Sequence, residues 1–110
     1  MGVQHADLAA GRWVRMSLAE QMANIGSELE RALSWRAKNN PDYSRRAAAR
    51  ALELADLSLA GSREFSRLKE IARMREILVD FFYGANRYGS SETSLGNYFL
   101  HFARAARRDR

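Results

Sequence analysis

Apolar residues recur along most of this chain at alternating intervals of three and four, the spacing that places them on one side of an α-helix. The clearest run follows Ser17 and consists of Leu18, Met22, Ile25, Leu29 and Ala32. Ser17 and Glu20 have the spacing of a capping box, in which each side chain accepts a hydrogen bond from the other residue's backbone. The pattern predicts a long helix from residue 17 to between Trp35 and Lys38.

A second helix is predicted to begin at Pro41, which suits the first turn of a helix and follows a good capping residue, Asn40. It should run to about residue 60 and end at Gly61. Because only Gly61 and Ser62 separate it from the next apolar run, the two helices are expected to form an antiparallel hairpin. The predicted contact surface combines one tyrosine with small and medium apolar residues: Tyr43, Ala47, Ala51, Leu54, Ala55 and Leu57.

The third predicted helix spans residues 63–83 and has the widest apolar arc, which predicts a central position in the fold. The arc consists of Phe65, Leu68, Ile71, Ala72, Met74, Leu78, Phe81 and Phe82. Arg75 lies on the same arc, so we expect it to be partly buried beside a carboxylate or at an oligomer contact, with Glu28 and Glu53 as candidate partners.

The fourth predicted helix spans residues 92–106, after a loop that begins at Gly84 and ends at a capping Ser90 or Ser91. Its inward positions are Leu95, Tyr98, Phe99, Phe102 and Ala106. Four helices with short connections predict an all-α fold, an up-and-down four-helix bundle. Residues 1–12 lack the pattern and are expected to form a disordered or loosely attached tail, with residues 13–110 as one domain and Trp13 as an anchor.

The charge balance makes nucleic acid a candidate partner. The chain has 18 basic and 13 acidic residues and a pI near 10.2. Residues 1–40 contain five basic and four acidic groups, 41–61 three and three, 62–84 five and four, and 85–110 five and two. The excess of basic residues therefore lies mainly in the C-terminal segment, residues 85–110. Sixteen of the basic residues are Arg, which suits bidentate phosphate binding, although a GC-rich genome would produce the same bias.

Composition also bears on location. The chain has no cysteine, which fits a reducing compartment. No apolar run approaches the roughly 18 residues that cross a bilayer, and MGVQHADLAAGRWVRM lacks the apolar core of a signal peptide. We expect a cytoplasmic protein without membrane association.

No catalytic, cofactor-binding or metal-binding residue is predicted. Metal sites in helical bundles use Glu-x-x-His spacing on facing helices, and His101 has no acidic residue within one turn of its own helix. No serine lies in a nucleophile motif. HEPN-like ribonucleases carry an Arg that is separated from a late His by a spacer of four to six residues, but Ser94, Leu95 and Gly96 occupy those positions before His101. Such an enzyme is therefore only the third hypothesis.

The predicted nucleic-acid site is the polar stripe of the fourth helix together with the loop before it. The predicted contacts are Asn97, His101, Arg104, Arg107 and Arg108 on the helix and Arg87 and Tyr88 in the loop. The amide and imidazole would bind bases, and the arginines would bind phosphates. Two structural explanations stay open, because cations favour any helix C-terminus and the loop tyrosines could instead close the end of the core.

Three segments, SLAEQMANIGSELERALSW, RALELADLSLA and YFLHFARAARR, resemble a recurrent family of small helical prokaryotic proteins. This resemblance covers about residues 13 to 108 and implies no activity. In length, charge and helix number the chain is similar to the bundle proteins encoded in ribosomal RNA intervening sequences. It is similar in the same way to the accessory variability proteins of diversity-generating retroelements. That likeness implies ring-like oligomers that bind nucleic acid together with a reverse transcriptase.

Two functions rank above the HEPN-like enzyme. The first is a non-enzymatic accessory protein that binds nucleic acid, RNA in particular, within a larger complex that includes another protein. The second is a protein-interaction module, such as an antitoxin-like or scaffold bundle, whose arginines only keep it soluble. With eleven aromatic residues in so small a chain, some should form an exposed apolar patch, which predicts a homo-oligomer.

Overall fold

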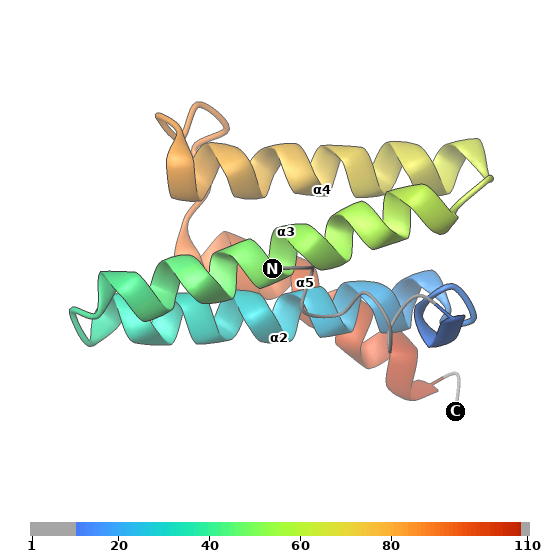
Figure 1. Ribbon diagram of the computed structural model, residues 1–110, viewed down its shortest axis with the longest axis horizontal. Helices are drawn as coiled ribbons and strands as arrows, with labels where there is room; N and C mark the ends of the chain where they lie inside the picture. The colour runs from blue at the N-terminus through green and yellow to red at the C-terminus, as the bar shows by residue number, and fades with distance from the viewer. Residues whose placement is uncertain (1–10, 109–110) are drawn as a thin grey trace.

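The computed structural model describes residues 11–108, and every segment of regular secondary structure among them is helical. Four long helices follow one another along the chain (Figure 1): α2 (Leu18–Ala37), α3 (Pro41–Gly61), α4 (Phe65–Tyr83) and α5 (Glu92–Arg108). The predicted all-α fold is confirmed.

The capping residues recognised in the sequence do begin these helices. Ser17 Oγ accepts a 3.1 Å hydrogen bond from the Glu20 amide, and the Glu20 carboxylate accepts one of 3.0 Å from the Ser17 amide. The Asn40 side chain accepts a hydrogen bond from an amide in the first turn of α3. Ser91 and Ser94 form the same reciprocal pair at the start of α5. Each cap satisfies amides that the first turn of a helix leaves without partners.

The helix α2 occupies the middle of the fold, where it packs against both α3 and α5. Figure 1 shows α3 antiparallel to α2 on one side and to α4 on the other, so the predicted hairpin of α3 and α4 is confirmed. Small residues make the central position possible. A side chain at Gly26 would place its Cβ 2.8 Å from Phe99 Cβ, so the glycine lets α5 cross α2 closely.

The prediction that residues 63–83 form the central helix is wrong. The backbone of α4 packs most closely against α3, and its buried residues are Ile71, Met74 and Leu78. Phe65, at its beginning, is 78% exposed. A wide arc of bulky side chains keeps neighbouring backbones at a distance, whereas the alanines and glycine of α2 and α3 allow close approach. Arg75 is partly buried beside a carboxylate as predicted, but its partner is Asp56, at 2.7 Å.

The core is continuous across all four helices and includes Trp13, whose predicted docking is confirmed. Trp13 is 4% exposed, and its indole Nε1 donates a 2.9 Å hydrogen bond to Ser58 Oγ. The Gln21 amide donates to the Trp13 carbonyl at 2.8 Å. Residues 1–10 of the predicted tail lie outside the described range, and residues 11–13 are helical. The core members are Trp13, Met22, Ile25, Leu29, Ala51, Leu54, Ala55, Ile71, Met74, Leu78, Leu95 and Phe99.

Tyr43 does not take the inward position that the sequence pattern predicts. It is 44% exposed and packs against the Trp35 ring on the outside of the fold. Its neighbour Ser44 is buried instead, because the Ser44 hydroxyl donates a 2.8 Å hydrogen bond to the Ala32 carbonyl of α2. The small serine lets α2 and α3 approach closely where a tyrosine would separate them.

The side chain of Tyr98 joins α5 to α4. Its hydroxyl donates a hydrogen bond to the Glu70 carboxylate, and the tyrosine is partly buried between the helices. Burial, followed by this hydrogen bond to Glu70, raises the pKa of Tyr98 far above its ordinary value. The proton is therefore held more tightly in the folded chain than in the unfolded one.

The free energy of unfolding should consequently fall as the pH rises above the ordinary tyrosine pKa of 10.0. Above that pH the unfolded chain releases the Tyr98 proton while the folded chain keeps it, which gives a slope of up to about −1.4 kcal/mol per pH unit. Urea denaturation between pH 9 and pH 11.5 measures this slope. Tyr98→Phe should flatten it and Tyr43→Phe should not, and an equal slope in both variants would contradict the assignment.

Candidate nucleic-acid interface

The residues predicted on α5 lie together on its exposed side. They are Asn97, His101, Arg104, Arg107 and Arg108. Within residues 11–108, none of these three arginines forms an ion pair with a carboxylate. The His101 ring rests edge-on against Phe102, with 5.3 Å between the ring centroids. The α5 stripe is therefore a cationic surface whose guanidinium groups are available to an anion.

The loop residues Arg87 and Tyr88 form a separate group at the other end of α5. Their amides donate hydrogen bonds of 2.8 and 3.0 Å to the two carboxylate oxygens of Asp80, and the Tyr88 hydroxyl donates to Glu76. These bonds hold the loop against the end of α4. Since α5 has 17 residues and rises about 1.5 Å per residue, the loop and the last arginines of α5 lie roughly 25 Å apart. The structure does not bring all the predicted residues together.

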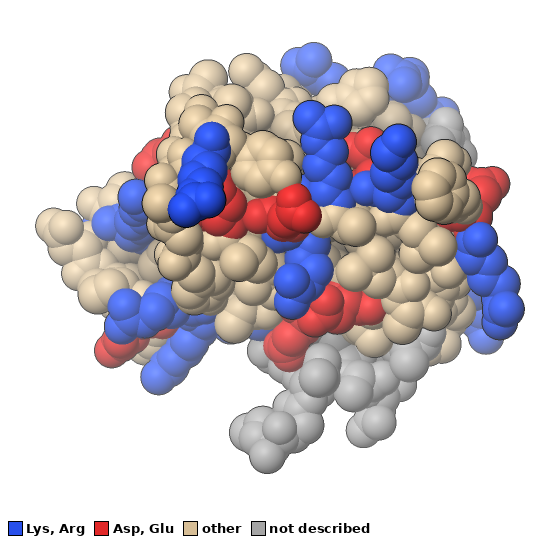
Figure 2. Space-filling view, turned by 90° about the horizontal axis from the view of Figure 1, so that it is seen from above, with Lys and Arg blue, Asp and Glu red and all other residues tan. Residues whose placement is uncertain are grey.

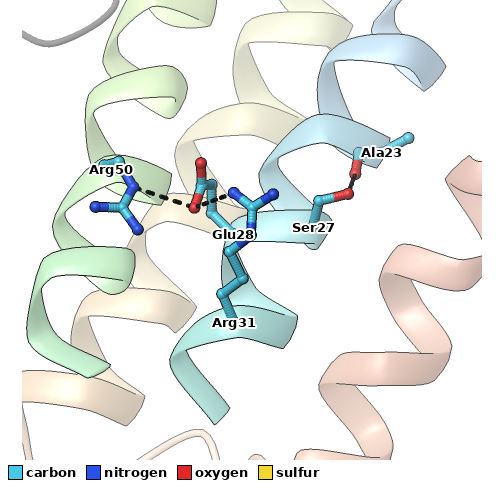
Figure 3. A network of polar contacts seen from close by, with 5 residues as sticks. All are labelled: Ala23, Ser27, Glu28, Arg31 and Arg50. Atoms are coloured by element: carbon cyan, nitrogen blue, oxygen red, sulfur yellow. Dashed lines mark hydrogen bonds and ion pairs between the residues drawn. The ribbon is translucent and has the colours of Figure 1, made fainter. Parts of the chain in front are cut away.

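Two other arginines, Arg31 and Arg50, share one buried carboxylate (Figure 3). Glu28, which is 6% exposed, accepts contacts from Arg50 Nε at 3.2 Å and from an Arg31 guanidinium nitrogen at 3.3 Å on the same carboxylate oxygen. The Glu28 carboxylate lies between α2 and α3, where water cannot easily replace its partners. The Arg50 contact therefore joins α3 to α2, whereas Arg31 contacts Glu28 within α2 and keeps an exposed side chain.

The outer face of α4 does not present a uniform positive surface. Seen from the α4 side, Lys and Arg side chains alternate with Asp and Glu side chains (Figure 2). The Arg75–Asp56 pair belongs to this mixed population. Such interleaving cancels the field at the distance of an approaching polyanion.

A denser cationic group lies where α2 ends and α3 begins. Lys38 Nζ lies 5.1 Å from the Trp35 ring centroid, Trp35 and Tyr43 pack edge to face at 4.8 Å, and Arg46 Cζ lies 5.4 Å from the Tyr43 ring. We call Lys38, Trp35, Tyr43 and Arg46 the cation–aromatic ladder. Cations over aromatic faces are attracted by the ring quadrupole, so the ladder places two adjacent rings between two positive charges on the surface.

A pocket of about 250 Å³, the end pocket, opens at the same end of the molecule. Arg36 enters it from α2, with its Cζ 5.1 Å from the Phe81 ring centroid. Arg45 enters from α3 and pairs with Asp42 at 2.9 Å. The full lining is Arg36, Pro41, Ser44, Arg45, Ala48, Phe81, Phe82 and Tyr83. Cations and aromatic rings from three helices therefore converge on one concavity.

This cluster was not predicted from the sequence, because charges were counted in segments that met at the α2–α3 turn. Residues 36–46 contain four basic residues and one acidic residue, but a boundary at Pro41 assigned two cations to each of two nearly neutral segments. A window that crossed the turn would have found the excess. Nothing in the spacing indicated that Phe81 and Tyr83, some forty residues away, would join it.

The described residues contain neither a metal-binding cluster nor a helix that could span a membrane. No group of three or more His, Cys, Asp or Glu side chains there is arranged to hold a metal ion. None of the described helices is both long and apolar enough to cross a membrane. Comparisons with protein-family models, with curated proteins and with solved structures find no match to this chain.

Proposed function

We propose that this chain is an up-and-down four-helix bundle that binds single-stranded nucleic acid, RNA in particular, as a non-enzymatic accessory protein within a larger complex. The observation that carries the proposal is the pair of neighbouring aromatic rings flanked by cations around the α2–α3 turn. Polyanionic strands are bound by positive charge along their backbone, and their unpaired bases stack on exposed aromatic rings. Both kinds of contact are available at this one end.

The ladder supports a strand, rather than a duplex, as the ligand. Bases in a duplex are stacked on one another and cannot reach a protein ring, whereas unpaired bases can. The Tyr43 ring is packed on one edge by Trp35 and remains nearly half exposed. Because its neighbours already fix its orientation, little side-chain freedom would be lost when a base stacks on it.

The cationic end of α5 provides a second place for phosphates in this proposal. The molecule is 36 Å in its longest dimension, and Figure 1 places the C-terminal end of α5 on the opposite side from the α2–α3 turn. At about 3.4 Å per nucleotide of a stacked strand, roughly ten nucleotides would span the two ends. Arg104, Arg107 and Arg108 would hold the distal part of such a strand.

Filter binding of a twelve-nucleotide RNA strand at several salt concentrations tests the proposal. Binding should weaken as salt rises, with log affinity falling by roughly 0.7 per phosphate contact for each unit of log salt. Four contacts at the turn and three on α5 predict a slope between about −3 and −5. Absence of binding at 20 mM salt, or a slope near zero, would contradict the proposal.

We also propose that copies of the chain associate, most simply as a dimer. Exposed apolar side chains support this, among them Val14 and Leu100, and pairing would bring two cationic surfaces into one assembly. Light scattering at tens of micromolar should give about twice the monomer mass of 12.5 kDa. A mass of one chain at that concentration would contradict the proposal. A dimer that bound no RNA would favour the protein-interaction module instead.

A further inference from the structure

We infer that the end pocket binds one unpaired nucleotide of a strand, with the base against Tyr83 and the adjoining phosphate between Arg36 and Arg45. The inference rests on the proposed function and names the part of the ligand that this pocket would take. Three features of the pocket support it: its volume, the exposed ring of Tyr83 and the two arginines of its lining.

The pocket has the size and floor that a single base requires. Its volume of about 250 Å³ lies just below the roughly 300 to 1,000 Å³ of pockets that enclose larger ligands, which suits a ligand as small as one base. The buried Ser44 and Ala48 form its floor. The Ser44 hydroxyl donates to the Ala32 carbonyl, which leaves the floor without a free donor.

Tyr83 supplies the ring for stacking. It is the last residue of α4 and is 51% exposed. Among the described residues it makes no ring contact and no side-chain hydrogen bond. Phe81 and Phe82, by contrast, pack edge to face against each other at 5.1 Å. One wall of the pocket is therefore fixed, and the aromatic face at its rim is unoccupied.

The two arginines select an anion. The Arg36 guanidinium stacks near Phe81 and has no carboxylate partner within residues 11–108. Stacking uses the face of a guanidinium and leaves its N–H edge free to donate. Arg45 shares one contact with Asp42, and both side chains are exposed, so a phosphate can readily replace that carboxylate. No Asp or Glu lines the pocket, and a cationic or neutral ligand would leave the Arg36 charge without a partner.

Fluorescence anisotropy with two labelled probes tests this inference. One probe is an eight-nucleotide oligoriboadenylate, and the other is an abasic chain with the same number of phosphates. Tyr83→Ala should lower affinity for the oligoadenylate by roughly 5- to 150-fold, the range measured for loss of base stacking, and should leave the abasic chain unaffected. Phe65→Ala, which removes an exposed ring from the opposite end of α4, should change neither affinity.

An arginine variant should affect the two probes differently from Tyr83→Ala. Arg36→Gln should weaken both probes equally and reduce the salt slope by about 0.7, while Arg63→Gln, at the far end of α4, should do neither. If wild type binds both probes equally, or if Tyr83→Ala weakens both alike, the inference is overturned and phosphate binding still stands. If neither probe binds at low salt, the inference fails together with the proposed function. Circular dichroism of each variant checks that it is folded.

Discussion

Replacing the four cations of the α2–α3 end by glutamine is expected to lower affinity for single-stranded RNA by two to three orders of magnitude at 0.1 M salt. The variant changes Arg36, Lys38, Arg45 and Arg46. The electrostatic contribution to binding vanishes at about 1 M salt. Below that concentration, each phosphate contact raises log affinity by roughly 0.7 for every tenfold dilution of salt. Four contacts therefore contribute about 2.8 log units at 0.1 M, and the salt slope should fall by the same amount. Filter binding measures both quantities.

A matched variant separates a local effect from one of overall charge. Glutamine at Arg12, Arg63, Lys69 and Arg73 removes the same four charges from other parts of the surface. These four side chains are exposed, as are the four at the α2–α3 end. Both variants should therefore fold. The matched variant should lose less than about tenfold, because exposed charges more than roughly 10 Å from the strand are screened at 0.1 M salt. Equal losses in the two variants would show that net charge alone governs binding, and would remove the α2–α3 end as the site.

Trp13→Ala is expected to lower the free energy of unfolding by roughly 3 to 5 kcal/mol, the range for removal of a buried tryptophan from a core. The indole is 4% exposed and packs in the same core cluster as residues of all four long helices. Its loss would also leave Ser58 without the hydrogen bond from Nε1. In a small domain of marginal stability, such a loss is a large fraction of the total. Urea denaturation followed by circular dichroism measures it.

Two other substitutions test how much of this loss of stability comes from the hydrogen bond and how much from burial of the ring. Trp13→Phe keeps most of the ring and removes the N–H donor, so its cost should approach the roughly 1 to 3 kcal/mol of an unsatisfied buried hydroxyl. Val14→Ala removes apolar atoms from the neighbouring exposed position, and should cost less than about 1 kcal/mol. Similar losses for Trp13→Ala and Val14→Ala would mean that Trp13 is not an anchor of the core.

Helix boundaries could be predicted from the sequence because they depend on neighbours along the chain. Ser17 and Glu20 lie three residues apart, and so do Ser91 and Ser94, so each pair meets as soon as one turn of helix forms. Pro41 lacks an amide hydrogen and can only begin a helix. The apolar stripe of α2 likewise follows from its own period. These signals need no knowledge of any other helix.

Which helix is central, and which surface is cationic, depended on residues far apart in the sequence. Gly26 makes α2 the middle helix only because Phe99 crosses it, and Tyr43 faces outward because Ser44 bonds to the Ala32 carbonyl. Periodicity shows that a residue lies on an apolar face, but not how closely a neighbouring backbone approaches that face.

The residues of the proposed site likewise fall into those that could be predicted from the sequence and those that could not. The exposure of the α5 stripe followed from its helical spacing, so its residues could be named from the sequence. The end pocket could not, because Arg36, Arg45 and Tyr83 come from three helices and meet only when α4 packs on α3 and α3 on α2. Local hydrogen bonding and periodicity thus determined the helices of this protein, and packing between distant segments decided which of its charges and rings share a surface.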